Sequence, residues 1–316
     1  MTRALLITNP AAARTDARAV SVVRDALRQA GWTVEVAATA QPGDARRLAL
    51  RGRDEGFDAL LSYGGDGTAM QVAAAIAGTG IPLGLLPGGT GNVLAGNLRL
   101  PRSPLPAARA ILRAVPVRID LGAVERADGT HYFAVCCGAG FDAALMQRTD
   151  SATKRRWRRA AYVRAALTAL PQVKSSRVRI TIDGVDTHLD AAMVLVANCA
   201  DLMPPLLRLR HDIRPDDGIL DVVAMRADGM WQSMAAFVEL MQRRAAGRRD
   251  QVWYGRGANI AIAVEEAGAP PLPAQLDGED VGTTPLAARV LPGALQVFVD
   301  PDTSPVPVNG GARRDG

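Results

Sequence analysis

The segment from Asp58 to Asn92 decides the fold: it reads DALLSYGGDGTAMQVAAAIAGTGIPLGLLPGGTGN. Its two apolar runs, 58–63 and 81–86, each end in a glycine-rich loop, and a helical pattern starts after each loop, at Thr68 and at Asn92. Strands and helices that alternate through short loops are typical of a parallel sheet covered by helices. We therefore predict an α/β fold around this segment.

The alternation continues on the N-terminal side of this segment. Strands are predicted at 4–8 and 32–36, and helices at 15–30 and 44–51, the first of which ends at Gly31. Because the pattern persists to about residue 117, we predict an α/β domain over 1–117.

Beyond residue 117 the pattern changes to strands joined by hairpin signals. These signals are Asp128-Gly129, Asp183-Gly184 and Pro292-Gly293. We predict a mostly antiparallel β domain over 118–300, interrupted by helical segments at 153–170 and 230–244, and its last strand is compatible with a return to the first domain. Residues 301–316 are rich in Pro, Gly and Arg and are expected to form a disordered tail. The predicted fold class is thus α/β plus β.

Composition and charge limit the partners. No stretch approaches the roughly 20 apolar residues of a membrane span, and the N-terminal apolar run is too short for a signal peptide, so we expect a cytoplasmic protein.

The net charge is +5, and basic residues cluster at 154–159 and 243–249. Such clusters suit an anionic membrane surface, although a solvated face in an Arg-rich chain is the alternative. With 4% aromatic residues the chain lacks base-stacking platforms, and we expect no nucleic acid partner.

Three predicted strands end in loops that suit a phosphate. They are Asn9-Pro10, Gly64 to Thr68, and Pro87 to Asn92. In a parallel sheet ligands bind at the carboxyl ends of strands, and glycines let backbone N–H groups approach a phosphate closely. The helices that open at Thr68 and Asn92 direct their positive ends to the same place. We therefore predict a phosphate site where these loops converge.

Other motifs are weighed against this site. No GxxxxGK[ST] P-loop is present, and Gly138 to Ala143 fits GxGxxA without an acidic residue about 20 positions later, so it is interpreted as a tight turn rather than a dinucleotide motif. Asp66 beside polyphosphate requires a bridging Mg²⁺ or a proton; the alternative is a helix cap. The acidic turns 216–221 and 277–280 offer oxygen ligands and a carboxylate base for phosphoryl transfer, or are ordinary hairpin turns.

Together these motifs resemble the diacylglycerol kinase catalytic domain family, which includes bacterial lipid kinases and sphingosine kinases. The matching elements, in order, are Asn9-Pro10, Thr39 before Gly43-Asp44-Ala45, Gly64 to Thr68, Pro87 to Asn92, Ile119 to Gly122, Gly138 to Ala143, Asp217-Gly218 and Asp277-Gly278-Glu279. The resemblance covers nearly the whole chain and implies the use of ATP and Mg²⁺.

The resemblance also implies roles for individual residues. ATP would be contacted by Asn9, Pro10, Thr39, Gly64, Gly65, Asp66, Gly67, Thr68, Gly89, Thr90 and Asn92. Asp66 would lie close to the phosphates, and Asp277 would be the general base, with Glu279 as its alternative or assistant. Mg²⁺ would be held by Asp217 and the backbone oxygens of Arg214 and Ile219, and linked through water to Asp120.

The chain departs from the family pattern twice, at Val93, where an Asp usually follows Asn92, and at 203–207, where a glycine-rich stretch is usual. Both departures concern the acceptor more than the nucleotide. The resemblance implies an ATP-dependent lipid kinase that acts between the two domains, converts diacylglycerol into phosphatidic acid in phospholipid biosynthesis, and associates peripherally with membrane; a homodimer is one candidate assembly. The alternatives are an NAD kinase-like enzyme and a non-catalytic lipid-binding protein.

Overall fold

The computed structural model describes residues 1–140, 174–203, 207–210, 212–229, 232, 251–266 and 268–308. The chain divides into two compact units. Unit 1 comprises Met1–Leu121, Pro215–Asp217 and Pro292–Gly316, and unit 2 comprises Gly122–Arg214 and Gly218–Leu291. The first passage between units therefore falls four residues beyond the predicted boundary at 117, and the last residues of the final strand belong to unit 1.

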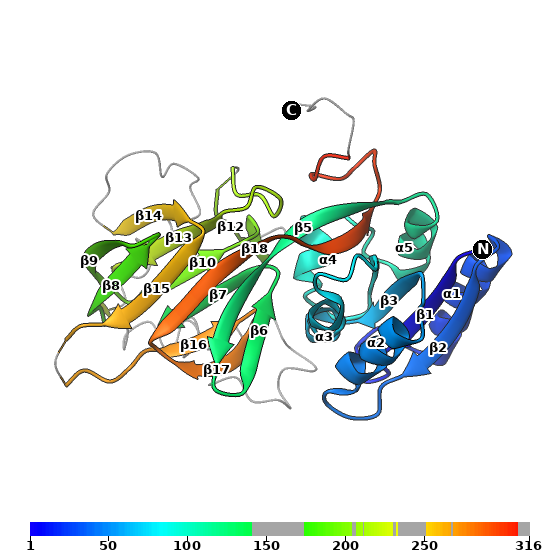
Figure 1. Ribbon diagram of the computed structural model, residues 1–316, viewed down its shortest axis with the longest axis horizontal. Coiled ribbons are helices and arrows are strands. Elements are labelled where there is room, and N and C mark those ends of the chain that lie inside the picture. Colours follow the sequence, from blue (N-terminus) through cyan, green and yellow to red (C-terminus); the bar gives the residue numbers. More distant parts are fainter. Residues whose placement is uncertain are drawn as a thin grey trace. The chain divides into compact units, whose positions relative to one another are not determined.

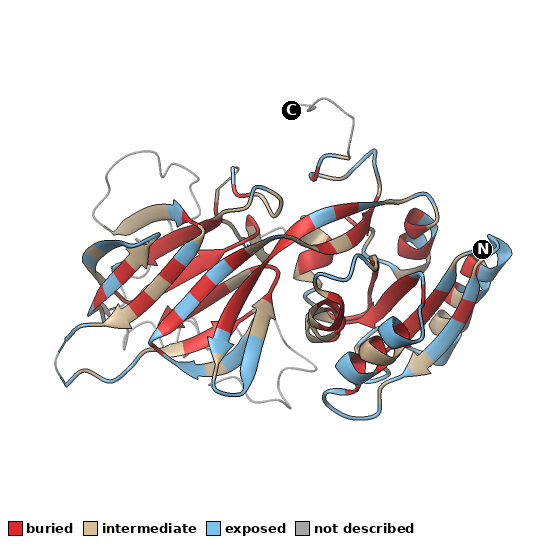
Figure 2. Ribbon diagram, in the orientation of Figure 1, coloured by how far each residue is buried: buried red, intermediate tan, exposed pale blue. Residues whose placement is uncertain are grey.

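Unit 1 is built on a parallel sheet (Figure 1). Its strands are β1 (Arg3–Thr8), β2 (Thr33–Ala38), β3 (Ala59–Gly64) and β4 (Leu83–Pro87), in the order β2-β1-β3-β4. The end of β18 (Leu286–Val299) adds to β4 in parallel, with Val297 opposite Leu83. Every residue of β3 and β4 is buried, as Figure 2 shows. Burial on both faces explains why these strands are continuous apolar runs rather than alternating ones.

Helices cover both faces of this sheet. They are α1 (Ala17–Gln29), α2 (Asp44–Asp54), α3 (Asp66–Ile76), α4 (Val93–Asn97) and α5 (Pro104–Ile111). α1 begins where the Asp16 carboxylate accepts the Ala19 amide at 2.7 Å, and it packs with α5 over Leu6 and Leu61. α2 packs with α3 on the opposite face, where Gly52 permits close approach, since a Cβ there would lie 2.8 Å from Leu5.

Unit 2 consists of two sheets packed face to face. One contains β14 (Val252–Gly257), β13 (Leu220–Met225), β10 (Met193–Ala197), β7 (Cys136–Gly140), β16 (Pro273–Leu276) and β17 (Glu279–Thr283) in that order. The other contains β5 (Val115–Arg126), β6 (Gly129–Phe133), the start of β18, β15 (Asn259–Val264), β8 (Ser176–Ile182) and β9 (Val185–Ala191). A short pair, β11 (Asp201–Met203) and β12 (Leu207–Arg208), stands apart from both. The predicted fold class is confirmed.

Two local predictions were wrong. Pro292-Gly293 is not a hairpin, because β18 runs through it from Leu286 to Val299. Gly293 has a φ of 59° there and donates its amide to Oδ1 of Asp120 at 2.7 Å, so the irregular backbone meets a buried carboxylate rather than reversing the chain. The tight turn predicted over 138–143 is wrong for its described part, since Gly138 and Gly140 lie within strand β7; residues 141–143 lie outside the described residues.

The C-terminal segment differs from the expected tail over 301–308. Thr303 and Ser304 donate their amides to the Asp300 carbonyl, and Val306 is buried. The predicted helical segments at 153–170 and 230–244 lie almost entirely outside the described residues. Among the residues that are described, no helix is long and apolar enough to cross a membrane.

Candidate active site

Three loops at the carboxyl ends of β1, β3 and β4 are joined by backbone hydrogen bonds. The Asn9 amide donates to the Tyr63 carbonyl at 3.0 Å, and the Gly88 amide donates to the Gly64 carbonyl at 2.8 Å. The Arg14 amide donates to the Gly88 carbonyl at 2.9 Å. The loops after these strands therefore converge in unit 1, as the sequence predicted, and we call them the loop frame.

Side chains reinforce the loop frame. Nδ2 of Asn9 donates to Oγ1 of Thr68 at 3.0 Å, and Oδ1 of Asn9 accepts the Ala11 amide. Thr68 is buried beneath Gly64, where a Cβ would lie 2.7 Å from its hydroxyl oxygen. Asn9 and Thr68 thus fix the position of the loops, whatever contact they make with a nucleotide.

The glycines of the two glycine-rich loops, after β3 and after β4, face each other across the loop frame. A Cβ on Gly89 would lie 2.6 Å from the Cα of Gly65, and one on Gly88 would lie 3.2 Å from the Cα of Gly64. The amides of Gly88 and Gly89 both donate to the Gly64 carbonyl. Close loop packing therefore requires these glycines, and their two amides are engaged within the protein.

The first turn of α3 is the part of the frame best suited to an anion. This helix has 11 residues, and its N-cap, Gly65, makes no side-chain cap hydrogen bond. The first amides of a helix lack intrahelical acceptors and carry the positive end of the dipole. The residues 65–68 can therefore present N–H groups to a phosphate.

The helix that begins after Asn92 does not serve this purpose, contrary to the prediction. Helix α4 has five residues, and the amide of Val93 at its start donates to Oδ1 of Asp66 at 2.6 Å. Burial raises the pKa of the Asp66 carboxyl, and hydrogen bonds from Val93 and its neighbours oppose this shift. Asp66 thus caps α4, the alternative that the sequence left open.

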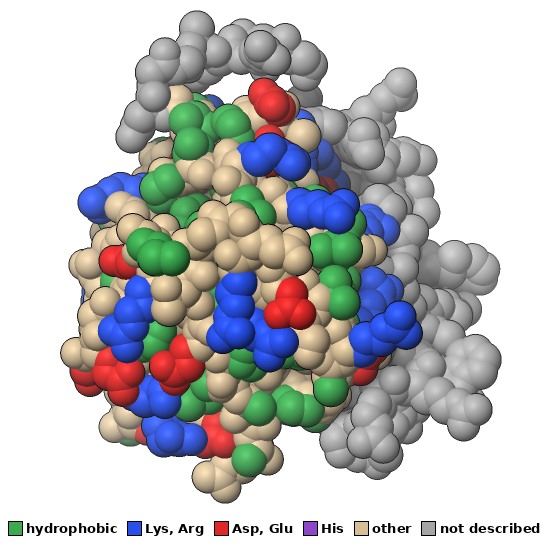
Figure 3. Space-filling view, turned by 90° about the vertical axis from the view of Figure 1, so that its right-hand side faces the viewer, with side chains coloured by type: hydrophobic (Ala, Val, Ile, Leu, Met, Phe, Trp, Pro, Cys, Tyr) green, Lys and Arg blue, Asp and Glu red, His purple; other side chains and the backbone are tan. Residues whose placement is uncertain are grey.

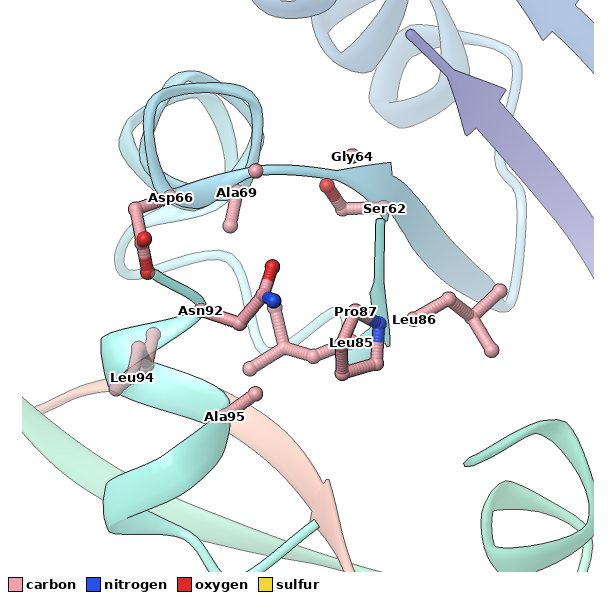
Figure 4. Close-up of a pocket in the computed structure, with 11 residues that line it drawn as sticks. Ser62, Gly64, Asp66, Ala69, Leu85, Leu86, Pro87, Asn92, Leu94 and Ala95 are labelled. Carbon is pink, nitrogen blue, oxygen red and sulfur yellow. The ribbon is translucent and has the colours of Figure 1, made fainter. Parts of the chain in front are cut away.

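Asn92 braces its own loop. It adopts a left-handed conformation with φ 50°, its Oδ1 accepts the Gly89 amide at 3.0 Å, and its Nδ2 donates to the Gly89 carbonyl at 2.7 Å. Figure 4 shows its side chain directed into a small cavity, toward which Asp66 and Ser62 also point. The cavity measures about 10 Å³, room for a single water molecule. The cavity is therefore too small to hold a nucleotide.

The remaining predicted nucleotide contacts lie at the same sheet edge or beside it. Thr39 follows β2, and its amide donates to the Thr8 carbonyl at 2.8 Å. Pro10 is exposed, whereas Gly67 and Thr90 are half-buried. Their contact with ATP stays a prediction.

Asp277 lies in unit 2, in a two-residue hairpin between β16 and β17. Asp277 and Gly278 both have positive φ, 46° and 88°, the conformation that an Asp-Gly hairpin favours. The carboxylate accepts three backbone amides: Oδ1 from Val135 at 3.0 Å and Cys136 at 2.8 Å, and Oδ2 from Ala134 at 2.8 Å. Hydrogen bonds of this kind hold a carboxylate in one orientation and favour its ionised form. Glu279, the alternative base, is exposed.

Asp120 and the Asp216-Asp217 turn meet within unit 1. Asp120 is buried, its amide donates to the Pro215 carbonyl at 2.6 Å, and its Oδ1 accepts the Gly293 amide. Asp217 is exposed. No cluster of three metal-binding side chains occurs among the described residues, and the predicted magnesium ligands stay a prediction. Carboxylate, carbonyl and water oxygens are the ligands that Mg²⁺ prefers, so these residues fit the ion.

Two comparisons of sequence identify the chain. Residues 3–124 match the diacylglycerol kinase catalytic domain, and residues 135–299 match the YegS C-terminal NAD kinase beta sandwich-like domain. Over 283 residues the chain is 31% identical to the Pseudomonas aeruginosa protein named "Probable lipid kinase YegS-like", covering 89% of each chain. The chain belongs to this family of lipid kinases.

Further relatives agree with this assignment. The chain is 28% identical over 260 residues to a diacylglycerol kinase of Mycobacterium tuberculosis, covering 81% of each chain. A crystal structure of a diacylglycerol kinase from Bacillus anthracis superposes with a TM-score of 0.73 at 20% identity, covering 95% of this chain and 97% of that one. At this identity the superposition shows the fold alone. The resemblance inferred from the motifs is confirmed.

For a lipid kinase, the basic segments at 154–159 and 243–249 are of interest as membrane contacts, but they lie outside the described residues. Figure 3 shows one described face, on which Lys and Arg side chains are interspersed with acidic and apolar ones. This face carries no single basic patch among the residues described.

Sequence reasoning missed some residues of the lipid kinase's loop frame. The buried Tyr63 hydroxyl donates to the Arg14 carbonyl at 2.7 Å, which holds the loop after β1. Thr15 is buried against Gly88, 2.5 Å from where a Cβ there would lie. Ser62 is buried and its hydroxyl has no partner among the described residues. No sequence signal marks Tyr63 or Thr15, because each contacts a loop distant along the chain.

Proposed function

We propose that this lipid kinase transfers the γ-phosphoryl group of ATP to a lipid hydroxyl, with diacylglycerol as the acceptor and a phosphatidic acid as the product. The observation that carries the proposal is the loop frame, in which three strand-end loops are cross-linked around the first turn of α3. A helix N-terminus beside glycine-rich loops binds phosphate through its amides. Membership of the family supplies the reaction class.

ATP would bind to the outer side of the loop frame, with its phosphates near the amides of residues 65–68. Asp66, whose pKa is raised by burial, would be close to these phosphates. Mg²⁺ would be held by Asp217 and the backbone oxygens of Arg214 and Ile219, with a water link to Asp120. When bound, this ion neutralises charge on the phosphates.

Asp277 would accept the proton of the acceptor hydroxyl as the bond to phosphorus forms. Three backbone amides hold its carboxylate, which supports this role because a general base must be ionised and fixed in orientation. Glu279 remains its alternative. The acceptor lipid would be reached at an anionic membrane surface, with the basic segments at 154–159 and 243–249 as contacts.

The test is incubation of the purified protein with [γ-³²P]ATP, Mg²⁺ and a panel of acceptors, followed by thin-layer chromatography. The panel contains diacylglycerol, a long-chain base, a polyprenol and NAD. We expect label in phosphatidic acid, with at least about 100-fold less in an Asp66→Asn variant. Label in a different lipid would change the acceptor, label in NADP would support the NAD kinase alternative, and no label in any product would contradict the proposal.

A further inference from the structure

In unit 2, the residue after strand β10 and the residue after strand β16 both contact the segment that leads into strand β7. Strand β7 lies between β10 and β16, with Ala197 of β10 opposite Cys136 and Leu276 of β16 opposite Cys137. The next residue after β10 is Asn198, and the next after β16 is Asp277. Both contact the segment 134–136, which leads into β7.

Asn198 donates hydrogen bonds to the backbone carbonyl groups of this segment. Its Nδ2 donates to the Ala134 carbonyl at 2.9 Å, and its backbone amide donates to the Val135 carbonyl at 2.8 Å. Asn198 is 0% exposed. Cys199 adds its amide to the Val135 carbonyl at 3.1 Å and its thiol to the Ala134 carbonyl at 3.2 Å.

The Asp277 carboxylate accepts the backbone amides of the same segment. The contacts of Asp277 and those of Asn198 involve the same peptide groups. The Ala134 carbonyl and the Val135 amide belong to one planar peptide; the first accepts from Asn198 and the second donates to Asp277. The next peptide repeats the pattern, since the Val135 carbonyl accepts from Asn198 and the Cys136 amide donates to Asp277. A rotation of either plane would disturb both ends together.

We propose that Asn198 is a positioning residue for the Asp277 carboxylate, acting through the two peptide planes of the segment 134–136. The inference rests on the proposed function, in which Asp277 is the base. Without the Asn198 side chain, the buried Ala134 carbonyl loses its amide donor, and the Ala134–Val135 plane is free to tilt, although the backbone amides of Asn198 and Cys199 still hold the Val135 carbonyl. The Val135 amide that fixes the carboxylate then moves with this plane, and proton transfer, which depends on geometry, slows.

The functional test is a double-mutant cycle on phosphoryl transfer. Asn198→Ala should lower kcat about 10- to 100-fold while the Kd for ATP stays within about threefold. In an Asp277→Asn background the same change should have no further effect, because residues that act as one unit are not additive. Effects that multiply in the double variant would show that Asn198 acts on the fold alone and would overturn the proposal. Cys199→Ala removes the weaker thiol donor to the same carbonyl and should lower kcat less than Asn198→Ala does.

A second readout does not depend on activity. Hydrogen exchange of the amides at 134–136 should be at least about tenfold faster in Asn198→Ala, and that of the Ala134 amide should be faster in Asp277→Asn, with β15 (Asn259–Val264) unchanged as an internal reference. If Asn198→Ala does not fold, Asn198→Ser keeps a smaller donor and should show intermediate exchange. Unchanged exchange at 134–136 in a folded Asn198 variant would also overturn the proposal. A wild-type protein that phosphorylates no acceptor would instead refute the proposed function, and exchange would still decide whether Asn198 fixes Asp277.

Discussion

The backbone amide of Val93 lies 2.6 Å from Oδ1 of Asp66, so the start of α4 is capped by a carboxylate from the start of α3. This bond links the loop after β4 to the loop after β3, in addition to the backbone bonds from Gly88 and Gly89 to Gly64. Asp66 therefore stabilises the loop frame through a hydrogen bond and also contributes a carboxylate to it. Substitutions at this position should separate the two contributions.

Asp66→Asn should reduce turnover at least about 100-fold. The amide has nearly the same volume and its Oδ1 can still accept the Val93 amide, so the loop frame should persist while the charge is removed. Steady-state phosphorylation of diacylglycerol, with circular dichroism as a check of folding, measures the effect. Turnover within a few-fold of wild type would exclude Asp66 from the reaction.

The same variant should be more stable than wild type at neutral pH. The pKa of Asp66 is raised in the folded protein, mainly by burial, so between the ordinary carboxyl pKa and the raised one the folded state binds more proton than the unfolded chain. The free energy of unfolding of wild type therefore falls as pH rises from the ordinary carboxyl pKa through the raised one. Asp66→Asn does not lose stability in this way. Its higher free energy of unfolding relative to wild type should disappear at a pH below both the ordinary and the raised carboxyl pKa.

Asp44→Asn supplies a control of opposite sign for this measurement. The pKa of Asp44 is lowered, chiefly by the hydrogen bond from the Ala40 amide and then by Arg47. Its ionised form therefore stabilises the fold above the ordinary carboxyl pKa, and this contribution is lost as pH falls through the lowered value. Asp44→Asn should be less stable than wild type at neutral pH. Urea unfolding from about pH 2 to pH 8 compares both variants, and equal behaviour of the two would contradict the assignment.

The facing glycines of the loop frame predict a second pair of outcomes. Gly89→Ala would place a Cβ 2.6 Å from the Cα of Gly65, a backbone atom that cannot move without shifting the loop, whereas Gly65→Ala would place one 3.6 Å from the Cα of Gly89, an ordinary contact. We expect Gly89→Ala to lower the free energy of unfolding by about 1–3 kcal/mol and Gly65→Ala to leave it nearly unchanged. Thermal unfolding of both variants tests this, and equal losses would contradict the packing.

Gly65→Ala also reports on the nucleotide. Because the first turn of α3 begins at this residue, an added methyl group should hinder the close approach of a phosphate. The Kd for ATP should rise about tenfold or more in a protein of near-normal stability, as isothermal titration calorimetry can measure. Normal affinity would place the phosphates elsewhere.

Local sequence signals were sufficient for most elements of unit 1 and for the convergence of its loops, although helix α5 (Pro104–Ile111) was not predicted. The helix predicted over 15–30 spans Ala17–Gln29, and its start is set by Asp16, a cap readable from the sequence. The strand order β2-β1-β3-β4 was not predicted, because the position of a strand in a parallel sheet depends on contacts that no short window contains.

Non-local partners account for the errors. Pro292-Gly293 has the composition of a turn, yet the Asp120 carboxylate binds the Gly293 amide and β18 continues. The amides of the glycine-rich loops were expected to face a phosphate, but those of Gly88 and Gly89 donate to Gly64. Composition identified loops that can approach an anion, whereas the acceptor of each amide depended on a loop more than 20 residues away.

Asp277→Asn is the decisive variant for the proposed base. The hydrogen bonds of Asp277 indicate that this substitution should affect stability as well as turnover. The amide Oδ1 can retain the bonds from Val135 and Cys136, but an NH₂ group in place of Oδ2 would face the Ala134 amide, donor against donor. We therefore expect a loss of about 1–3 kcal/mol in the free energy of unfolding, together with a fall in turnover of about 10² to 10⁴-fold.

Unit 2 contains a matched control that separates these two effects. Asp183 and Gly184 form a second Asp-Gly hairpin with positive φ at both residues, 47° and 85°, and the Asp183 carboxylate accepts the amides of Ala258 and Asn259. Asp183→Asn should therefore lower stability and leave phosphorylation intact. With Asp277→Asn, turnover should collapse while the Kd for ATP stays near normal. If ATP affinity falls with turnover, Asp277 is a metal or structural residue, and if turnover survives, the proton is taken by Glu279 or by another group.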